Sequence, residues 1–357
     1  MVGEVALPPS DAPVVGRDRP GAPLLQVTDL CVDFPTLDGV VHAVRGVSFT
    51  LVDKGVLAIV GESGSGKSVT SLAIMGLLPK TARVSGSIMY RGTELLGMSD
   101  KDKADLRGRE LAMIFQDPMT ALNPVYRVGW QLAEAVRAHQ DVSWKQAHRQ
   151  AVSLLARVGI PNPEERARDY PHQFSGGVRQ RVVIAMAIAN DPDVIVADEP
   201  TTALDVTVQA QILETMEALR RSTSAAMILI THDLGVVAGS ADHVLVMYAG
   251  RPVEVGTVDD VYYRPRMPYT VGLLGALPHL DRSHSGRLVP VVGAPPSLIN
   301  LPPGCPFSPR CPIATERCQA EEPELRLVGV DHQSACHYAE NVPAMARERL
   351  GSAAEPG

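Results

Sequence analysis

The sequence predicts an α/β fold built around a mostly parallel sheet with helices on both faces. Three observations predict it: short apolar runs without polar alternation, helical patterns between those runs, and a composition of 45% hydrophobic and 20% charged residues. Continuous apolar runs indicate strands buried on both faces, which is the usual state of parallel strands. A chain of 357 residues with this composition buries a sizeable core and suits one large or two modest domains.

The expected strands and helices alternate along the chain from residue 24. We expect strands at 24–27, 43–51, 56–60, 112–115, 194–197, 226–230 and 244–248. We expect helices at 67–78, 128–139, 144–158, 177–190 and 206–221. Residues 1–23 are rich in Pro, Gly, Ala and Asp without periodicity, which predicts a mobile leader. Proline becomes frequent after Pro265, so we expect a domain boundary near 263, a loop-rich extension to 340, and a tail over 341–357 that forms one short helix.

Charge and composition exclude several classes of protein. The net charge of −7 and the 4% aromatic content argue against a nucleic-acid partner, which needs a basic footprint or stacking rings. No apolar run approaches the ~18 residues of a membrane helix, and the N-terminus has no signal pattern, so we expect a soluble intracellular protein. Four of the five cysteines lie between 305 and 336, which in a reducing compartment favours metal binding over disulfides.

A glycine-rich segment between an expected strand and an expected helix matches the phosphate-binding pattern G-x-x-x-x-G-K-[ST] in full. Glycines let backbone amides converge on phosphate oxygens at a helix N-terminus. Lys67 is expected to reach the β- and γ-phosphates, and the Ser68 hydroxyl to hold Mg²⁺. The chain therefore binds a nucleoside triphosphate, with a predicted contact set of Gly61, Glu62, Ser63, Gly64, Ser65, Gly66, Lys67, Ser68 and Val69.

Two adjacent acids end the expected strand at 194–197. Asp198 is placed to coordinate Mg²⁺ through water, and Glu199 is a candidate general base for the attacking water. Acids also occur at strand-to-loop junctions simply as solvated side chains, and that alternative loses most of its weight because a phosphate-binding loop lies upstream.

The segment Phe174-Ser175-Gly176-Gly177-Val178 precedes a helix and makes a family resemblance specific. The chain resembles the nucleotide-binding subunits of ATP-binding cassette (ABC) transporters, whose signature is Leu-Ser-Gly-Gly-Gln. Phe174 replaces the Leu and Val178 the Gln, while the Ser-Gly-Gly core is intact. The resemblance implies a P-loop ABC-type domain over 24–262, with a mixed sheet core and a helical subdomain, followed by a small Cys-containing extension over 263–340.

The resemblance also implies roles for further residues. Gln116 matches the loop that senses Mg²⁺ and the γ-phosphate, Asp205 the loop that crosses the dimer interface, and His232 the histidine that contacts the γ-phosphate. Lys67, Gln116, Glu199 and His232 form the implied catalytic set, and Ser68, Gln116 and Asp198 the Mg²⁺ set. Ser175, Gly176 and Gly177 would act in trans, on the nucleotide of a partner subunit. Phe34 is the candidate for stacking on adenine. The equal alternative is that Phe34 is a core residue of a strand.

Two longer segments narrow the resemblance to the oligopeptide/dipeptide/nickel import branch: 115–124 (FQDPMTALNP) and 170–177 (YPHQFSGG). This implies an ATPase that energises uptake of peptides or related solutes. The implied partners are a second ATPase subunit, identical or paralogous, two membrane permeases and, indirectly, an extracytoplasmic binding protein, with the chain on the cytoplasmic face of the membrane. The alternatives are a soluble ABC ATPase without membrane partners, or import of nickel chelates or oligosaccharides.

The four clustered cysteines have the spacing C-x5-C-x6-C-x17-C, which does not match common zinc fingers. An iron–sulfur cluster also takes four thiolates and tolerates irregular spacing. The family resemblance implies a 4Fe–4S cluster on Cys305, Cys311, Cys318 and Cys336. Structural zinc is the alternative, with His332 and His337 as spare ligands. A rival function makes the chain chiefly a redox or metal sensor, in which this segment regulates the ATPase.

Overall fold

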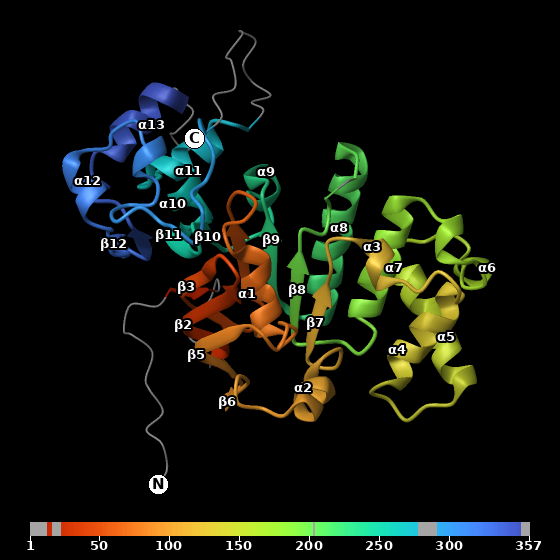
Figure 1. Cartoon of the computed structure of the whole chain (residues 1–357). Helices are drawn as coiled ribbons and strands as arrows, with labels where there is room; N and C mark the ends of the chain where they lie inside the picture. Colours follow the sequence, from red (N-terminus) through yellow and green to blue (C-terminus); the bar gives the residue numbers. More distant parts are fainter. Residues whose placement is uncertain (1–12, 16–22, 203, 278–290, 351–357) are drawn as a thin grey trace. The chain divides into compact units, whose positions relative to one another are not determined.

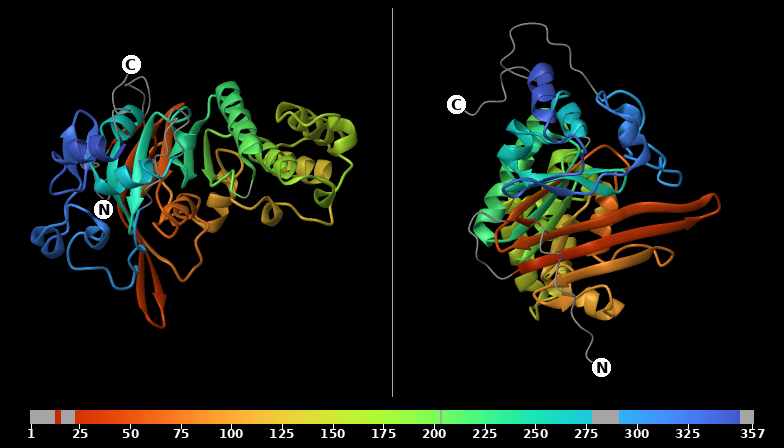
Figure 2. Two further views of the ribbon diagram at one scale, coloured as in Figure 1. Left: turned by 90° about the horizontal axis from the view of Figure 1, so that it is seen from above. Right: turned by 90° about the vertical axis from the view of Figure 1, so that its left-hand side faces the viewer.

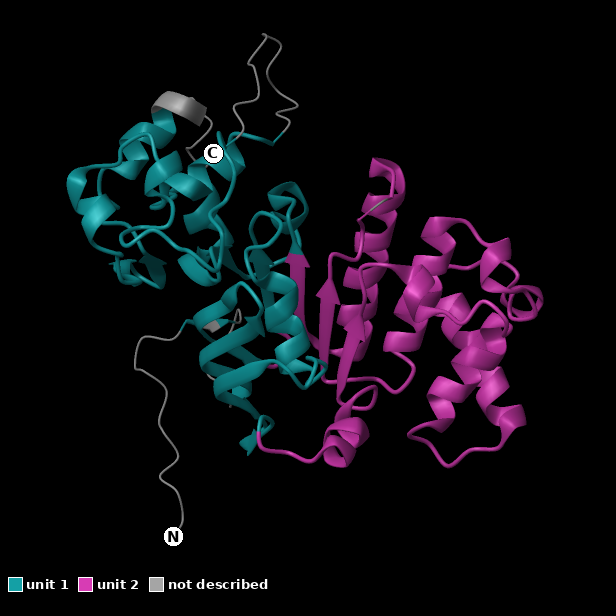
Figure 3. Ribbon diagram, viewed as in Figure 1, with its two compact units in different colours: residues 1–52, 56–96, 231–357 teal, residues 53–55, 97–230 magenta. Residues whose placement is uncertain are grey.

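The computed structural model describes residues 13–15, 23–202, 204–277 and 291–350 (Figure 1). The chain divides into two compact units (Figure 3): residues 1–52, 56–96 and 231–357 form unit 1, and residues 53–55 and 97–230 form unit 2. The leader predicted over 1–23 lies mostly outside the described residues. Its described part contains β1 (Val14–Val15), which pairs in parallel with β3 (Gly39–Val52).

Unit 1 contains a sheet built around one long hairpin, and its strands pair antiparallel except for β1, which is parallel to β3. Its strand order is β1-β3-β2-β5-β6, with β2 at Pro23–Thr36, β5 at Arg83–Tyr90 and β6 at Thr93–Glu94. Figure 2 shows β2 and β3 (red) as long neighbouring arrows. Both strands have 14 residues, longer than predicted, because their ends around the turn at Leu37 are half-buried or exposed and lack a clear apolar pattern.

The other strands of unit 1 follow the order β12-β13-β11-β10-β4, namely Arg326–Gly329, His332–Ser334, Arg251–Thr257, His243–Tyr248 and Val56–Val60. β10 pairs in parallel with β4, in the register Val244↔Ala58 and Val246↔Val60. β11 is antiparallel to β10, and the C-terminal strands β13 and β12 continue the antiparallel pairing. The sheet is therefore mixed, as the family resemblance implies, rather than mostly parallel.

The helices of unit 1 are short, and most come from its C-terminal part. They are α1 (Lys67–Ile74), α9 (Leu234–Val237), α10 (Val258–Tyr263), α11 (Pro268–Leu274), η2 (Ser308–Arg310), α12 (Glu316–Ala320) and α13 (Val342–Leu350). α1 packs on β2 and β3, and α13 packs on α11. α1 ends four residues before the predicted helix end, shortly before Gly76, whose φ of 62° is left-handed. α13 confirms the predicted helix of the tail.

Unit 2 contains three parallel strands and a group of helices. The strands are β7 (Leu111–Ile114), β8 (Val194–Asp198) and β9 (Ala226–Thr231), with Ile114 opposite Ala197 and Ala197 opposite Leu229. The helices are α2 (Asp100–Leu106), α3 (Pro118–Ala121), α4 (Val128–Arg137), α5 (Trp144–Arg157), α6 (Pro163–Arg166), η1 (Pro171–Gln173), α7 (Gly176–Ala187) and α8 (Val206–Thr223). α7 packs on β7, and α3, α4 and α5 pack on α7.

Burial follows the predicted pattern at the centre of each unit. Every residue of β4 and β10 in unit 1 and of β8 and β9 in unit 2 is buried, as continuous apolar runs predict. In the part of the chain that the structure describes, no helix has both the length and the apolar character needed to cross a lipid bilayer.

Candidate functional site

The glycine-rich loop of unit 1 has a backbone path that its glycines require. At Gly61 (φ 153°) a Cβ would lie 2.3 Å from the Met247 carbonyl oxygen, and at Gly66 (φ 102°) 2.4 Å from the Ala43 carbonyl oxygen. No side chain fits at either position, because the close neighbour is backbone. At Gly64 (φ 78°) a Cβ would meet nothing within 4 Å, so the tip of the loop is open. The loop from Gly61 to Gly66, called the cradle below, therefore has close backbone neighbours at its two ends and open space at Gly64.

Lys67 and Ser65 give this cradle its polar character. The Lys67 side chain is buried, and its Nζ donates hydrogen bonds to the carbonyl oxygens of Gly61 (2.8 Å) and Glu62 (2.9 Å). The Ser65 hydroxyl is buried and has no hydrogen-bond partner among the described residues. A buried orphan hydroxyl and an ammonium beside the N-terminus of α1 fit a ligand that brings acceptor oxygens and negative charge, as a triphosphate does. Ser68 is half-buried in the first turn of α1.

Glu62 of this loop is anchored by the C-terminal part of unit 1. Its backbone amide donates a hydrogen bond to the Tyr269 hydroxyl (2.7 Å), and its carboxylate accepts two from Arg310, at 2.6 Å and 2.8 Å. Burial raises the pKa of Tyr269, so its hydroxyl stays protonated. No sequence signal marks these anchors, because Tyr269 and Arg310 lie more than 200 residues after Glu62 and belong to no recognised motif.

The two acids of unit 2 lie at the carboxyl end of β8, as predicted. Asp198 is buried and Glu199 is half-buried, with a left-handed φ of 45°. Gln116 Nε2 donates a hydrogen bond to Glu199 Oε2 (3.1 Å), and so does the Thr202 hydroxyl (2.8 Å). Gln116 follows β7, whose last residue, Ile114, pairs with Ala197, so the carboxyl ends of these parallel strands bring Gln116 and Glu199 together. Sequence reasoning missed the contact of Thr202.

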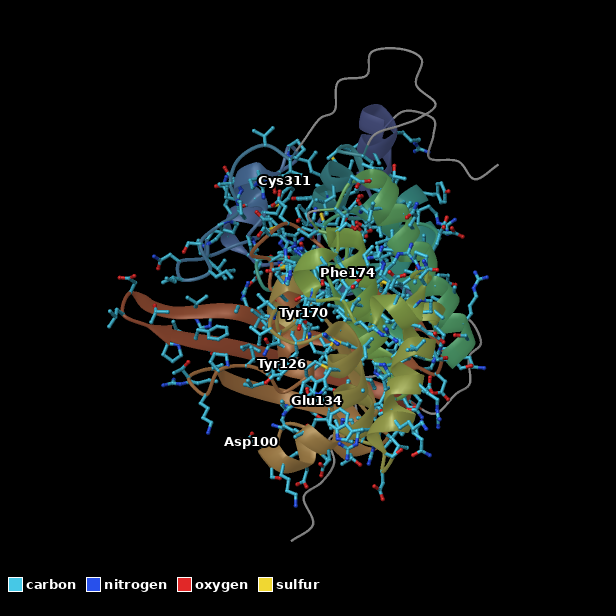
Figure 4. The ribbon with its side chains drawn as sticks, turned by 90° about the vertical axis from the view of Figure 1, so that its right-hand side faces the viewer. Asp100, Tyr126, Glu134, Tyr170, Phe174 and Cys311 are labelled. Carbon is cyan, nitrogen blue, oxygen red and sulfur yellow. The ribbon has the colours of Figure 1, made fainter. Side chains whose placement is uncertain are left out.

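The signature segment begins α7. Ser175 stands at the N-cap position, but its side chain makes no capping hydrogen bond, unlike Ser99 and Ser143, which cap α2 and α5. Ser175 and Gly176 are exposed, so a hydroxyl and backbone amides face outward at a helix N-terminus. Phe174, labelled in Figure 4, is buried, which keeps the apolar anchor expected from the substitution of Leu.

The other predicted site residues lie on separate elements. Asp205 caps α8, since its carboxylate accepts a hydrogen bond from the Val208 amide (3.0 Å). His232 is exposed and directly follows β9. Phe34 is half-buried in β2, opposite Val41 of β3. Unit 1 therefore carries Phe34, the phosphate-binding loop and His232, while unit 2 carries Gln116, the two acids, the signature segment and Asp205.

The four clustered cysteines share one neighbourhood. Cys318 and Cys336 are buried, while Cys305 and Cys311 (labelled in Figure 4) are half-buried. Burial raises the pKa of Cys336 to about 12, and the thiols of the other three cysteines add to the rise. The Cys305 amide donates a hydrogen bond to the Cys318 carbonyl oxygen (2.8 Å). Among the described residues, however, no group of three or more His, Cys, Asp or Glu side chains is arranged to hold a metal ion, so the predicted 4Fe–4S site is not supported.

The two histidines considered as zinc ligands have other partners. His332 is buried, and its Nε2 lies 2.8 Å from Oε1 of Glu254, which is fully buried in β11. His337 Nε2 lies 3.0 Å from the Glu321 carbonyl oxygen. The zinc alternative therefore gains no ligand from either histidine in this arrangement.

Comparison with known proteins identifies the family. Residues 44–202 match the ABC transporter family model, and residues 253–318 match the C-terminal region of oligopeptide/dipeptide transporters. The dipeptide transport ATP-binding protein DppD of Bacillus subtilis is 53% identical over 315 residues, which is 88% of this chain and 94% of that protein. The chain belongs to the ABC transporter family. Within it, the match to the C-terminal region supports the oligopeptide/dipeptide branch.

Other relatives and solved structures of ABC proteins agree with this assignment. The oligopeptide transport ATP-binding protein OppD of Mycobacterium tuberculosis is 57% identical over 322 residues, 90% of this chain but 53% of that protein. The chain thus spans about half the length of the mycobacterial relatives that it matches. The dimeric cassette MJ0796 bound to ADP and Pi (TM-score 0.59, 22% identity, 66% of this chain and 98% of that one) has the same fold. CbiO1 from Clostridium perfringens, part of an ABC transporter complex, aligns with a TM-score of 0.57 at 27% identity, over 68% of this chain and 91% of that one.

Proposed function

We propose that this chain is the ATP-hydrolysing subunit of an ABC importer that energises peptide uptake through partner permeases. The observation that carries the proposal is the placement of Glu199, whose carboxylate is held by Gln116 and Thr202 at the end of a buried strand. A carboxylate oriented by two hydrogen-bond donors is suited to activate a water molecule. The names of the relatives, which are peptide transport ATP-binding proteins, support peptide as the cargo.

The proposed roles in ATP binding follow from the chemistry of each side chain. Lys67 leaves the loop carbonyls and binds the β- and γ-phosphates, and the loop amides surround the phosphate oxygens. The Ser68 hydroxyl, Gln116 and Asp198 hold Mg²⁺, which neutralises charge on the β- and γ-phosphates when it is bound. Phe34 stacks on adenine.

The proposed hydrolysis uses residues beyond the γ-phosphate. Glu199 accepts a proton from the attacking water, and His232 contacts the γ-phosphate. Ser175, Gly176 and Gly177 complete the site on the nucleotide of a second ATPase subunit, across an interface that Asp205 contacts. The exposed, uncapped Ser175 hydroxyl supports this role, because it is left for a ligand rather than used on its own helix.

A row of exposed apolar side chains supports a membrane partner at the cytoplasmic face. Met119 and Val125 follow Gln116, and the rings of Tyr126 (labelled in Figure 4), Trp130 and Trp144 stack with centroid distances of 4.5 Å and 5.8 Å. We assign this surface of unit 2 to the permeases, since exposed aromatic and Met side chains are enriched at protein interfaces. A soluble ABC ATPase without a membrane partner is the competing function.

The cysteine segment enters the proposal as a candidate ligand set for a 4Fe–4S cluster. Four cysteine side chains in one neighbourhood support it, and the absence of a formed ligand group among the described residues weighs against it. Zinc is the alternative. Iron, zinc and acid-labile sulfide analysis of protein purified without oxygen tests both assignments, and protein that contains none of the three contradicts them.

The test of the proposed function is the variant Glu199→Gln in the transporter co-purified with its permeases. We expect ATP binding to persist and hydrolysis to fall to background, because an amide cannot accept the proton. Glu164→Gln, at an exposed acid of α6, is the matched control and keeps wild-type turnover. Near-normal hydrolysis by Glu199→Gln contradicts the assignment. ATPase activity that is unaffected by the permeases favours the soluble alternative. If nickel chelates or oligosaccharides, and not peptides, compete for uptake, the transported solute is one of those instead of a peptide.

A further inference from the structure

Arg310 of the cysteine-containing extension makes a two-pronged contact with the phosphate-binding loop. Its Nη1 donates to Glu62 Oε2 (2.6 Å) and its Nη2 to Glu62 Oε1 (2.8 Å). The Arg310 side chain is only 5% exposed, and that of Glu62 is 26% exposed. Such a bidentate pair is fixed in direction as well as strong, and it is screened far less than a surface pair. Arg310, which directly precedes Cys311, therefore holds Glu62, the second residue of the loop, in place.

The surroundings of the pair make it rigid. The rings of Tyr248, Tyr269 and Phe307 pack on one another with centroid distances of 4.6, 5.3 and 5.4 Å, and Arg310 lies over the rings of Tyr248 and Phe307. The Tyr248 hydroxyl accepts a further hydrogen bond from Arg310 Nη1 (3.2 Å). The rings of Tyr248 and Phe307 thus help to fix the position of the Arg310 guanidinium relative to the loop.

Glu62 also makes hydrogen bonds with residues proposed to bind phosphate. Its carbonyl oxygen accepts hydrogen bonds from Lys67 Nζ (2.9 Å) and from the Ser65 amide (3.2 Å). Its amide is bound to Tyr269, so both ends of the residue and its side chain are fixed. The backbone and the side chain of Glu62 are therefore both held in place beside the cradle.

The negative charge of Glu62 also needs a positive charge beside it. A carboxylate next to a cradle for a triphosphate repels the ligand, and the low-dielectric surroundings strengthen that repulsion. Arg310 supplies the opposite charge at hydrogen-bond distance. Without Arg310, the half-buried carboxylate would remain uncompensated beside the loop.

We propose that Arg310 is a positioning residue for ATP: it holds and neutralises Glu62, so that triphosphate affinity depends on the cysteine-containing extension. This inference rests on the proposed ATP-binding function. It gives the extension a part in the nucleotide site of its own unit that does not depend on whether the cysteines bind a metal.

The experiment measures the dissociation constant of ATP and the kcat of the co-purified transporter for five variants. They are Arg310→Gln, Arg310→Lys, Glu62→Gln, the double variant Arg310→Gln/Glu62→Gln, and Arg317→Gln as the control for an exposed arginine of the same extension. We expect Arg310→Gln to weaken ATP binding about tenfold, since it leaves a carboxylate unpaired, with a smaller change in kcat at saturating ATP. We expect Glu62→Gln to weaken ATP binding less than Arg310→Gln does, because the amide still accepts a hydrogen bond from Arg310 and leaves no unpaired charge. We expect Arg317→Gln to bind ATP as the wild type does.

The double variant separates charge and positioning from general damage. If Arg310 acts on ATP through Glu62, Glu62→Gln restores most of the affinity lost in Arg310→Gln, because the effects of paired residues are not additive. Should Arg310→Gln fail to fold, Arg310→Lys provides the test. Lysine keeps the positive charge but cannot make the two parallel hydrogen bonds to the Glu62 carboxylate. We expect Arg310→Lys to bind ATP less tightly than the wild type and to be rescued by Glu62→Gln as well.

Two results overturn the inference: an unchanged ATP affinity in Arg310→Gln, or a double variant that binds ATP as poorly as Arg310→Gln alone. Failure of the wild-type chain to bind ATP is a different outcome, because it removes the proposed function itself together with the inference. The two failures are therefore distinguishable.

Discussion

The hydroxyl of Thr202 offers a direct way to perturb the proposed general base without removing it. Thr202→Val keeps the shape of the side chain and deletes the donor that lies 2.8 Å from Glu199 Oε2. A hydrogen bond to a charged group contributes about 1.5–3 kcal/mol, and because both residues are half-buried we take the lower end. If that hydrogen bond orients Glu199 in the transition state, a loss of about 1.5 kcal/mol lowers kcat about tenfold.

The assay is steady-state ATP hydrolysis by the transporter assembled with its permeases. We expect kcat to fall in Thr202→Val while KM for ATP is unchanged, because the Thr202 hydroxyl contacts Glu199 and not the phosphate-binding loop. Thr202→Ser retains the hydroxyl and serves as the matched control, with near wild-type kcat. A Thr202→Val variant that hydrolyses ATP as fast as the wild type, or one in which only KM changes, would refute the reasoning.

Three other predictions concern residues of unit 1, two of them its stability and one its nucleotide binding. His332→Ala removes the buried partner of Glu254 and should lower the free energy of unfolding by about 3 kcal/mol in urea titrations; a loss under about 1 kcal/mol would contradict the pairing. Burial raises the pKa of Glu322, but its hydrogen bonds and ion pairs with two arginines outweigh burial and hold the pKa below its usual value of 4.5. Its folded-state pKa is below its unfolded one, so the charged form stabilises the fold above pH 4.5 and this contribution is lost as the pH falls through the lower folded pKa. Glu322→Gln should therefore flatten the acid side of a plot of melting temperature against pH, and an unchanged slope would count against these contacts. Gly61→Ala should abolish ATP binding, measured by calorimetry, because the new Cβ meets backbone; wild-type affinity would show that the loop can move.

The elements of this fold that the sequence predicted are those with a strong local pattern. β4, β8, β9 and β10 read as continuous apolar runs because both their faces are buried, and the predicted starts of α4 and α5 agree with the structure. The length of the β2–β3 hairpin was missed, since the ends of its strands near the turn are half-buried or exposed and carry no clear periodic signal. The mixed character of the sheet in unit 1 followed from the family resemblance alone, because a hairpin partner is not marked by apolar pattern.

The candidate site shows the same division between local and long-range information. The glycines, Lys67 and the two acids stand in contiguous motifs, so their residue types and their places at strand ends were predictable. The contacts of Glu62 with Tyr269 and Arg310 join segments more than 200 residues apart, and no property of a single sequence reports such pairing. The cysteine cluster shows the converse: the clustering of four cysteines and the family resemblance predicted a ligand set, whereas the side chains form no ligand group among the described residues.

Peptide uptake by the reconstituted transporter tests the central claim most directly. The measurement follows a labelled peptide into vesicles that contain the permeases, this chain and its companion ATPase subunit, with ATP on the side of the chain and the binding protein on the other. The account predicts ATP-dependent uptake with the wild-type chain and none with Lys67→Ala, which lacks the ammonium proposed to bind the phosphates. Equal uptake with the Lys67→Ala chain, or ATP hydrolysis that proceeds without any peptide movement, would contradict it.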